Sequence, residues 1–244
     1  MADASTRRRR PRRALLTLEA VVEAAARVLA RDGYAGLTMR AIADDLGVQA
    51  PALYWYVPSK EVLEGQLFDH LMGGFTVTLI DGDWRDQVRQ AARQLRAYMR
   101  PLRDISRLVP QNAPLGPNAI GQLEAGMGLL LSGGLTPKDA AYGFNLLSNY
   151  VFNWVAGEAA WGERLAAGEP LAASPDFDPA DHPNLAVTGH AFYADDLDGR
   201  FEFALDVMIA GLEVRAKRWD AESALVAGGR FSCSPPPIEV KIAC

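Results

Sequence analysis

The feature that most constrains this chain is the spacing of three residues within positions 37–60, LTMRAIADDLGVQAPALYWYVPSK. Ala43 is small enough to let a second helix approach, and Gly47 can take the turn conformation that side chains resist. Leu53, six residues after Gly47, is placed to hold that second helix against a core. Each position alone also fits two helices of an ordinary bundle, but the combination favours a helix-turn-helix, a DNA-reading arrangement.

Apolar residues recur at helical spacing along most of the chain, which predicts an all-α fold. Thr17 and Thr38 are expected to cap helices at their starts, and Gly33 and Gly47 to end them. Pro51 suits the first turn of a third helix. We find no alternating strand pattern and no internal repeat. Helices are predicted over 18–32, 39–46, 49–56, 60–79, 84–100, 103–109, 119–132, 137–157, 185–194 and 198–217.

These elements predict an N-terminal three-helix DNA-binding domain followed by a helical bundle for ligand binding and dimerisation. Residues 158–184 are expected to form one long loop, because they are rich in Gly, Pro, Asp and Ala. The predicted organisation is a disordered basic arm (1–16), a helix-turn-helix domain (17–62), a ligand-binding and dimerisation domain (63–219) and a disordered tail (220–244).

Charge is unevenly distributed along the chain. The formal net charge is −5, yet residues 1–13 hold six arginines and only one acid. So dense an arginine run cannot pack in a core; it is either a solubilising tail or an electrostatic arm for DNA phosphates or a minor groove. No apolar run is long enough to span a membrane, and Cys233 and Cys244 fit neither a disulfide framework nor a metal site. We therefore expect a cytoplasmic protein without a membrane partner.

Residues 33–72 resemble the DNA-binding region of the TetR (tetracycline-repressor) family. The matching pattern is G-x2-GLT-x-R-x-IA-x2-LGV-x3-LY-x-Y-x2-SK-x2-L, and the segment 53–57, LYWYV, is similar to the tetracycline repressors themselves. A weaker similarity at 203–213, FALDVMIAGLE, resembles the last dimerisation helix of that subgroup. Between these stretches only the helical pattern matches.

The resemblance implies a homodimer that places two recognition helices in successive major grooves of double-stranded operator DNA, about 34–36 Å apart. It implies phosphate contacts from Thr38, Tyr54 and Lys60. Arg40, Ala50, Pro51, Ala52, Trp55 and Tyr56 match positions that face bases or the groove. A buried Tyr54–Trp55 pair and a solvated Lys60 are the alternatives. Ala50 and Tyr56 stand where tetracycline repressors have an amide and a histidine, so we expect a different operator.

The second half of the chain is expected to bind a small-molecule effector between its helices. Amides and aromatic rings alternate near residue 149, and an unpaired buried amide costs about 1–3 kcal/mol, so these amides require partners. Pairing across a dimer interface is the equal alternative. The predicted lining residues are Phe75, Phe144, Asn145, Ser148, Asn149 and Phe152.

No metal or other cofactor is expected. The metal-binding positions of the tetracycline repressors fall near Thr76 and Val109, which cannot ligate a metal, and His70, His182 and His190 show no ligand spacing. Magnesium-tetracycline is therefore disfavoured. The habit of the family suggests a large aromatic or polyketide-like effector instead.

We expect dimerisation through helices 137–157 and 198–217, because the last helix is apolar around much of its circumference. The apolar residues are Phe201, Phe203, Leu205, Val207, Met208, Ile209 and Leu212. Helix 60–79 is expected to act as a lever, with Lys60 at the DNA and Phe75 at the sensor domain.

The function predicted from the sequence is a ligand-responsive repressor. The alternative is a transcriptional activator or a regulator that needs no ligand, and a helical adaptor for protein partners is a more distant one. An enzyme is not expected, because phosphate-binding, nucleophile-elbow, HExxH and paired-cysteine motifs are missing from the sequence.

Overall fold

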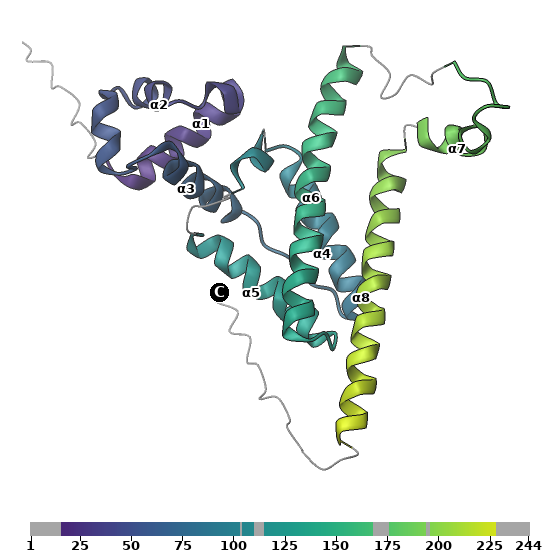
Figure 1. The fold of residues 1–244 in the computed structure, drawn as a ribbon. Coiled ribbons are helices and arrows are strands. Elements are labelled where there is room, and N and C mark those ends of the chain that lie inside the picture. Colours follow the sequence, from purple (N-terminus) through teal and green to yellow (C-terminus); the bar gives the residue numbers. More distant parts are fainter. Residues whose placement is uncertain (1–15, 103, 110–114, 168–175, 194–195, 228–244) are drawn as a thin grey trace, which may run out of the picture. The chain divides into compact units, whose positions relative to one another are not determined.

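The computed structural model describes residues 16–102, 104–109, 115–167, 176–193 and 196–227. Every regular element in these ranges is a helix, which confirms the all-α prediction (Figure 1). The chain divides into two compact units. Unit 1 comprises Met1–Gly74 and Leu102–Ala119, and unit 2 comprises Phe75–Pro101 and Ile120–Cys244.

Unit 1 begins with α1 (Leu18–Gly36), which the Thr17 side chain caps by accepting a hydrogen bond from the Ala20 amide at 3.1 Å. Gly33 interrupts the helix with a φ of 72°, near the predicted stop. The next helix, α2 (Met39–Leu46), is bounded as predicted by Thr38 and by Gly47, which is left-handed with φ 66° and ψ 33°. The predicted third helix is instead a 3-10 helix, η1 (Ala50–Trp55), with its proline in the first turn.

Helix α3 (Lys60–Met72) ends well before the predicted Leu79. Two glycines, Gly73 and Gly74, follow Met72, and each costs about 1 kcal/mol relative to alanine inside a helix. Residues 75–80 form no helix; the Thr78 backbone instead exchanges two hydrogen bonds of 2.8 Å with the Gln94 side chain. The expected continuous lever from Lys60 to Phe75 is therefore wrong.

A later segment of the chain completes unit 1. The 3-10 helix η2 (Ile105–Leu108) buries Ile105 and Leu108 in this unit, within the range where a helix over 103–109 was predicted. Further along, the buried carboxylate of Asp69 in α3 accepts hydrogen bonds from the Ala119 amide at 2.8 Å and the Asn118 side chain at 3.1 Å. The described residues of this segment, 102, 104–109 and 115–119, thus belong to unit 1, although the sequence placed them in the second domain.

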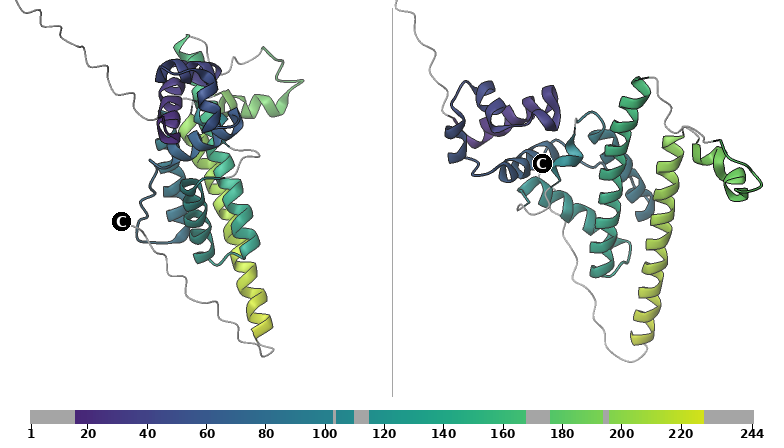
Figure 2. Two further views of the ribbon diagram at one scale, coloured as in Figure 1. Left: turned by 90° about the vertical axis from the view of Figure 1, so that its left-hand side faces the viewer. Right: turned by 45° about the horizontal axis from the view of Figure 1, so that its top comes forward.

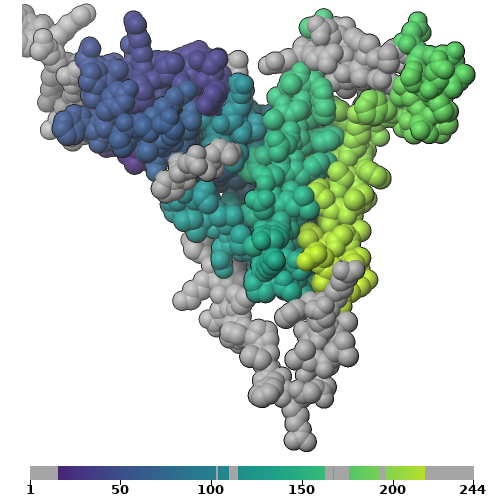
Figure 3. Space-filling view, viewed as in Figure 1, coloured from purple at the N-terminus to yellow at the C-terminus, as the bar shows by residue number. Residues whose placement is uncertain are grey.

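The helices of unit 2 are α4 (Trp84–Met99), α5 (Pro117–Ser132, which starts in unit 1), α6 (Pro137–Ala166), α7 (Pro183–Tyr193) and α8 (Leu197–Ala227). Three of them, α4, α6 and α8, pack side by side (Figure 2). The space-filling view shows α6 and α8 in contact along much of their length (Figure 3). The residues that fill this core include Val88, Leu147, Val151, Phe201 and Leu205.

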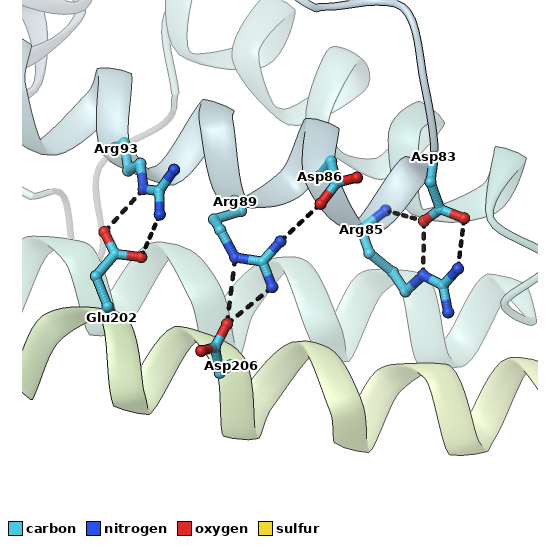
Figure 4. Close-up of polar contacts among 7 residues, drawn as sticks. All are labelled: Asp83, Arg85, Asp86, Arg89, Arg93, Glu202 and Asp206. Carbon is cyan, nitrogen blue, oxygen red and sulfur yellow. Dashed lines mark hydrogen bonds and ion pairs between the residues drawn. The ribbon is translucent and has the colours of Figure 1, made fainter. Parts of the chain in front are cut away.

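Ion pairs, as well as apolar contacts, join α4 to α8 (Figure 4). Arg93 donates two hydrogen bonds to Glu202 at 2.8 and 2.7 Å, and Arg89 binds Asp206 at 2.8 Å. Nearer the start of α4, Arg85 pairs with both Asp83 and Glu213. Arginines on successive turns of α4 therefore face carboxylates on α8.

Two helices extend beyond their predicted ends. Helix α6 continues to Ala166, into the stretch predicted as a loop, and α8 continues to Ala227, into the predicted tail. The basic arm and the tail beyond Ala227 lie outside the described residues. No helix among those described is both long and apolar enough to cross a membrane.

The left-handed turn at Gly47 yields a stability prediction. A Cβ at this position would meet nothing within 4 Å, so Gly47→Ala incurs only the backbone penalty, about 1–2 kcal/mol. We expect a lower melting temperature by circular dichroism, with a smaller loss for Gly47→Asn because asparagine tolerates this conformation.

Gly121→Ala is the matched control for that measurement. This glycine lies inside α5, its Cβ position is equally open, and its φ is not positive. Alanine should leave stability unchanged or raise it by about 0.5–1 kcal/mol. Equal effects at both glycines would contradict the conformational argument.

Candidate DNA interface and effector region

The start of α2 carries two of the predicted DNA contacts. Thr38 is exposed, and its hydroxyl oxygen accepts a hydrogen bond from the Ala41 amide at 3.1 Å. The hydroxyl can still donate its proton to a phosphate. Arg40 projects from the first turn with its side chain 91% exposed, and its only described ion pair is a long one, 4.0 Å, to Asp44. It is therefore free to reach a base edge.

Helix η1 exposes the aromatic side chains expected to meet the groove. Leu53 is fully buried and fixes the helix to the core, whereas Trp55 is 89% exposed and Tyr54 51% exposed. Tyr56 follows at 37%. The alternative of a buried Tyr54–Trp55 pair is wrong. The smaller predicted contacts lie on the same element: Pro51 is exposed, and Ala50 and Ala52 are half-buried.

Lys60 stands in the first turn of α3, after the cap that Ser59 forms with the Val62 amide at 3.3 Å. Its ammonium lies 3.5 Å from the Glu64 carboxylate and 4.7 Å from the centre of the Tyr34 ring. The side chain is 42% exposed. A cation beside the amide groups at a helix start is well suited to a phosphate.

Ion pairs join α1 to α2. Asp45 accepts a hydrogen bond from Arg27 at 2.8 Å and lies 3.2 Å from Arg31. The hydrogen bond from Arg27, followed by that from Arg31, lowers the pKa of Asp45, so its carboxylate stays ionised at neutral pH. Sequence reasoning missed this contact because its partners lie 14 and 18 residues away.

The predicted effector residues divide between two environments in unit 2. Phe75 and Phe144 both reach α5: the Phe75 carbonyl accepts a hydrogen bond from Gln122 at 2.8 Å, and the Phe144 ring covers Gly126 one turn later. Ser148 and Phe152 are half-buried on the same helix as Phe144, and the Ser148 hydroxyl donates to the Phe144 carbonyl at 2.8 Å.

Asn145 and Asn149 lie apart from that group. Both are exposed in the single chain, and the Asn149 amide donates to the Asn145 side chain at 3.0 Å. Tyr142 and Leu146 of α6 are also exposed, at 65% and 50%. This is the arrangement expected if the two amides face another surface rather than the interior of the subunit.

An aromatic cluster lies between α6 and α8. Tyr150 and Trp154 belong to the run of amides and aromatic rings noted near residue 149, but the predicted lining residues did not include them or Phe201. The Tyr150 hydroxyl donates to the Phe201 carbonyl at 3.0 Å, and burial raises the pKa of Tyr150 to about 12, so it remains a neutral donor. The Arg96 guanidinium lies 4.4 Å from the centre of the Phe201 ring and pairs with Glu158. Beside them, the buried Trp154 indole N–H has no hydrogen-bond partner among the described residues.

No group of three or more His, Cys, Asp or Glu side chains within the described ranges is arranged to hold a metal ion. His182 instead packs edge-on against Phe177, with ring centres 6.2 Å apart. His70 is exposed in the last turn of α3.

Two family models match the chain. The model described as bacterial regulatory proteins, tetR family, matches residues 21–65, which contain α2, η1 and the start of α3. The model for the tetracyclin repressor-like C-terminal domain matches residues 78–216. The second match covers more than half of the chain.

Individual proteins agree with the family models. An HTH-type transcriptional regulator of Saccharopolyspora erythraea is 31% identical over 211 residues, covering 83% of this chain and 86% of the relative. The class G tetracycline repressor of Vibrio anguillarum is 30% identical, over 79% of this chain and 91% of that protein.

Solved structures give the same result. ActR of Streptomyces coelicolor without ligand superposes with a TM-score of 0.74 at 31% identity, covering 83% of this chain and 97% of that one. ActR in complex with actinorhodin also gives 0.74, with 82% and 98% covered. This chain belongs to the TetR family of bacterial transcriptional regulators.

Proposed function

We propose that this chain represses transcription by binding a palindromic operator as a homodimer, and that a small-molecule effector releases it. The observation that carries the DNA-binding part is η1, which buries Leu53 and leaves Tyr54 and Trp55 exposed. Neighbouring exposed aromatic side chains of this kind often mark a binding surface. In this proposal they face the groove, Arg40 on α2 reads a base, and Lys60 on α3 binds a phosphate.

An unpartnered apolar surface on α8 supports the homodimer. Phe203, Val207 and Val214 recur at helical spacing and are 72%, 57% and 54% exposed in the single chain. Other apolar residues of α8, namely Phe201, Leu205, Ile209 and Leu212, are buried within the subunit. The predicted interface on α8 therefore centres on Phe203, Val207 and Val214.

Unit 2 contains aromatic side chains suited to stack against a large aromatic effector. Phe75 and Tyr98 pack 5.4 Å apart, and Tyr150, Trp154 and Phe201 form a second cluster. A buried indole N–H without a partner costs about 1–3 kcal/mol, which a ligand oxygen would recover. The complexes of ActR with actinorhodin and with (S)-DNPA support a ligand of this kind for a similar protein.

Effector binding releases DNA only if the effector prefers the conformation that cannot bind DNA. Typical couplings of about 1–3 kcal/mol would weaken operator binding about 5–150-fold. Because α3 ends at Met72, a single rigid helix cannot transmit the signal. The chain passes between the units at three places, residues 74–75, 101–102 and 119–120, and any of these connections can carry it.

Binding to the DNA upstream of the gene, measured by mobility shift, tests the proposal directly. Arg40→Ala should cost about 1–3 kcal/mol on the operator and little on random DNA, because a base contact is lost. Lys60→Ala should weaken binding to both DNAs equally. It should also lower the slope of log affinity against log salt by about 0.9 for each subunit, which is one phosphate contact. Equal losses on both DNAs for Arg40→Ala would reassign that residue to the phosphates.

The dimer is tested by Val207→Lys, which places a charge on the exposed face of α8. We expect monomers by light scattering with unchanged helicity, and loss of operator binding. Leu79→Lys, at a 49% exposed apolar residue outside α6 and α8, is the control and should remain dimeric. Leu212→Lys should instead unfold the sensor unit, because Leu212 packs against Gly143 inside the subunit. A dimeric, DNA-competent Val207→Lys protein would refute this interface.

The effector region is tested with actinorhodin as the probe in the same mobility-shift assay. Phe152→Ala, and separately Trp154→Phe, should leave DNA binding intact, while release should require a higher concentration of the compound. Asn153→Ala, on the exposed side of α6, should respond like the parent protein. If actinorhodin releases the parent and all variants alike, the effector binds elsewhere.

A further inference from the structure

An arginine from outside the helix-turn-helix shares an aromatic ring with Lys60. The Arg107 guanidinium lies 5.3 Å from the centre of the Tyr34 ring, and the Lys60 ammonium lies 4.7 Å from the same centre. The two cationic groups are therefore separated by no more than these two distances combined. Arg107 belongs to η2, in the range matched by the C-terminal family model, yet it lies in unit 1.

The backbone around Arg107 is tied closely to the DNA-reading unit. Asp104 has a left-handed φ of 54°, and its carboxylate accepts a hydrogen bond from the Tyr34 amide at 2.8 Å. The Arg107 amide in turn donates to the Asp104 carbonyl at 3.0 Å. Ile105 and Leu108, on either side, are almost completely buried. The position of Arg107 next to Tyr34 is thus fixed by contacts on both sides of it.

The charge of Arg107 is less neutralised than that of Lys60. Lys60 has Glu64 at 3.5 Å, and a hydrogen bond to Glu64 is the main reason that the pKa of Tyr34 is raised. Arg107 is exposed, and no carboxylate of the described residues forms an ion pair with it. An exposed, fixed and unpaired guanidinium is suited to a phosphate.

We propose that Arg107 is a further DNA-phosphate contact, acting beside Lys60 on neighbouring phosphates of one strand. The proposal rests on the proposed operator binding. Each DNA strand carries one charge per about 3.4 Å of helix axis, so two cations this close can reach phosphates only a few positions apart. Tyr34 holds both side chains in place. The sensor part of the sequence thereby supplies one cation of the DNA-binding surface.

Three variants separate this role from simple packing on Tyr34. Arg107→Ala should weaken binding to the upstream DNA and to a random duplex by a similar factor, on the order of tenfold for each subunit at 0.1 M salt. The slope of log affinity against log salt should fall by about 0.9 for each subunit, or about 1.8 for the homodimer. Arg107→Lys should keep the slope, because it keeps the charge. Combining Arg107→Ala with Lys60→Ala should lower the slope by two contacts for each subunit.

Arg100→Ala is the matched control. Arg100 is also an exposed arginine, with 62% of its side chain accessible, but it lies in unit 2. Its removal should leave both the affinity and the salt slope unchanged. Fluorescence anisotropy with labelled duplexes measures all of these quantities, and thermal unfolding reports whether each variant is folded.

The outcomes are distinguishable. If Arg107→Ala leaves the salt slope unchanged while Lys60→Ala lowers it, the proposal for Arg107 is overturned and operator binding stands. If Arg107→Ala lowers the melting temperature and the affinity without changing the slope, and Arg107→Lys does not restore them, the residue serves packing alone. If the parent protein binds neither duplex, both the operator proposal and this one fail.

Discussion

The left-handed turn at Gly47 is the constraint on which the DNA-reading unit depends. It ends α2 and reverses the chain within a few residues, so that Leu53 of η1 reaches the core beside Ile42 and Ala43. With Leu53 buried, the three residues that follow it face outward, and Val57 returns to the core. The exposure of Tyr54 and Trp55 is therefore a consequence of how Leu53 anchors η1. The left-handed conformation of Gly47 thus helps to decide which side chains reach the surface.

The two units are stabilised in different ways. Unit 1 encloses a compact apolar core from α1, α2, α3 and η2, with charge pairs such as Arg27–Asp45 at its edge. In unit 2, α4 meets α8 through a series of arginine–carboxylate pairs that are partly open to solvent. Pairs of this kind contribute about 0.2–1 kcal/mol each and are screened by salt. These pairs therefore add less to the stability of the α4–α8 contact than the buried side chains there, among them Phe201 and Leu205.

Local signals in the sequence predicted much of this structure. The caps at Thr17 and Thr38 and the glycine at position 47 are confirmed, because each depends only on residues within a few positions along the chain. The end of α3 was missed although Gly73 and Gly74 were visible, since the apolar pattern continued past them. The extension of α6 to Ala166 was missed because Gly157 and Gly162 resemble loop residues.

Contacts between distant residues could not be predicted in this way. Asp104 binds Tyr34 across 70 positions, and Asp69 binds Ala119 across 50. Neither aspartate carries a motif, and periodicity says nothing about partners so far apart. The DNA-contact residues could be predicted because they span 23 positions in a recognisable pattern. The contact of Phe201 with Tyr150 joins residues 51 positions apart, so the aromatic cluster could not be predicted in this way.

The attachment of residues 102–119 to unit 1 matters to anyone who recombines regulators of this family. A hybrid that joins this reading head to a foreign sensor at residue 74 would discard Ile105, Leu108 and the amide that satisfies Asp69. The head would then expose apolar surface, and Asp69 would lose the amide that binds its carboxylate. A working biosensor must graft the head as two separate pieces of chain, so the natural unit of exchange is discontinuous in the gene.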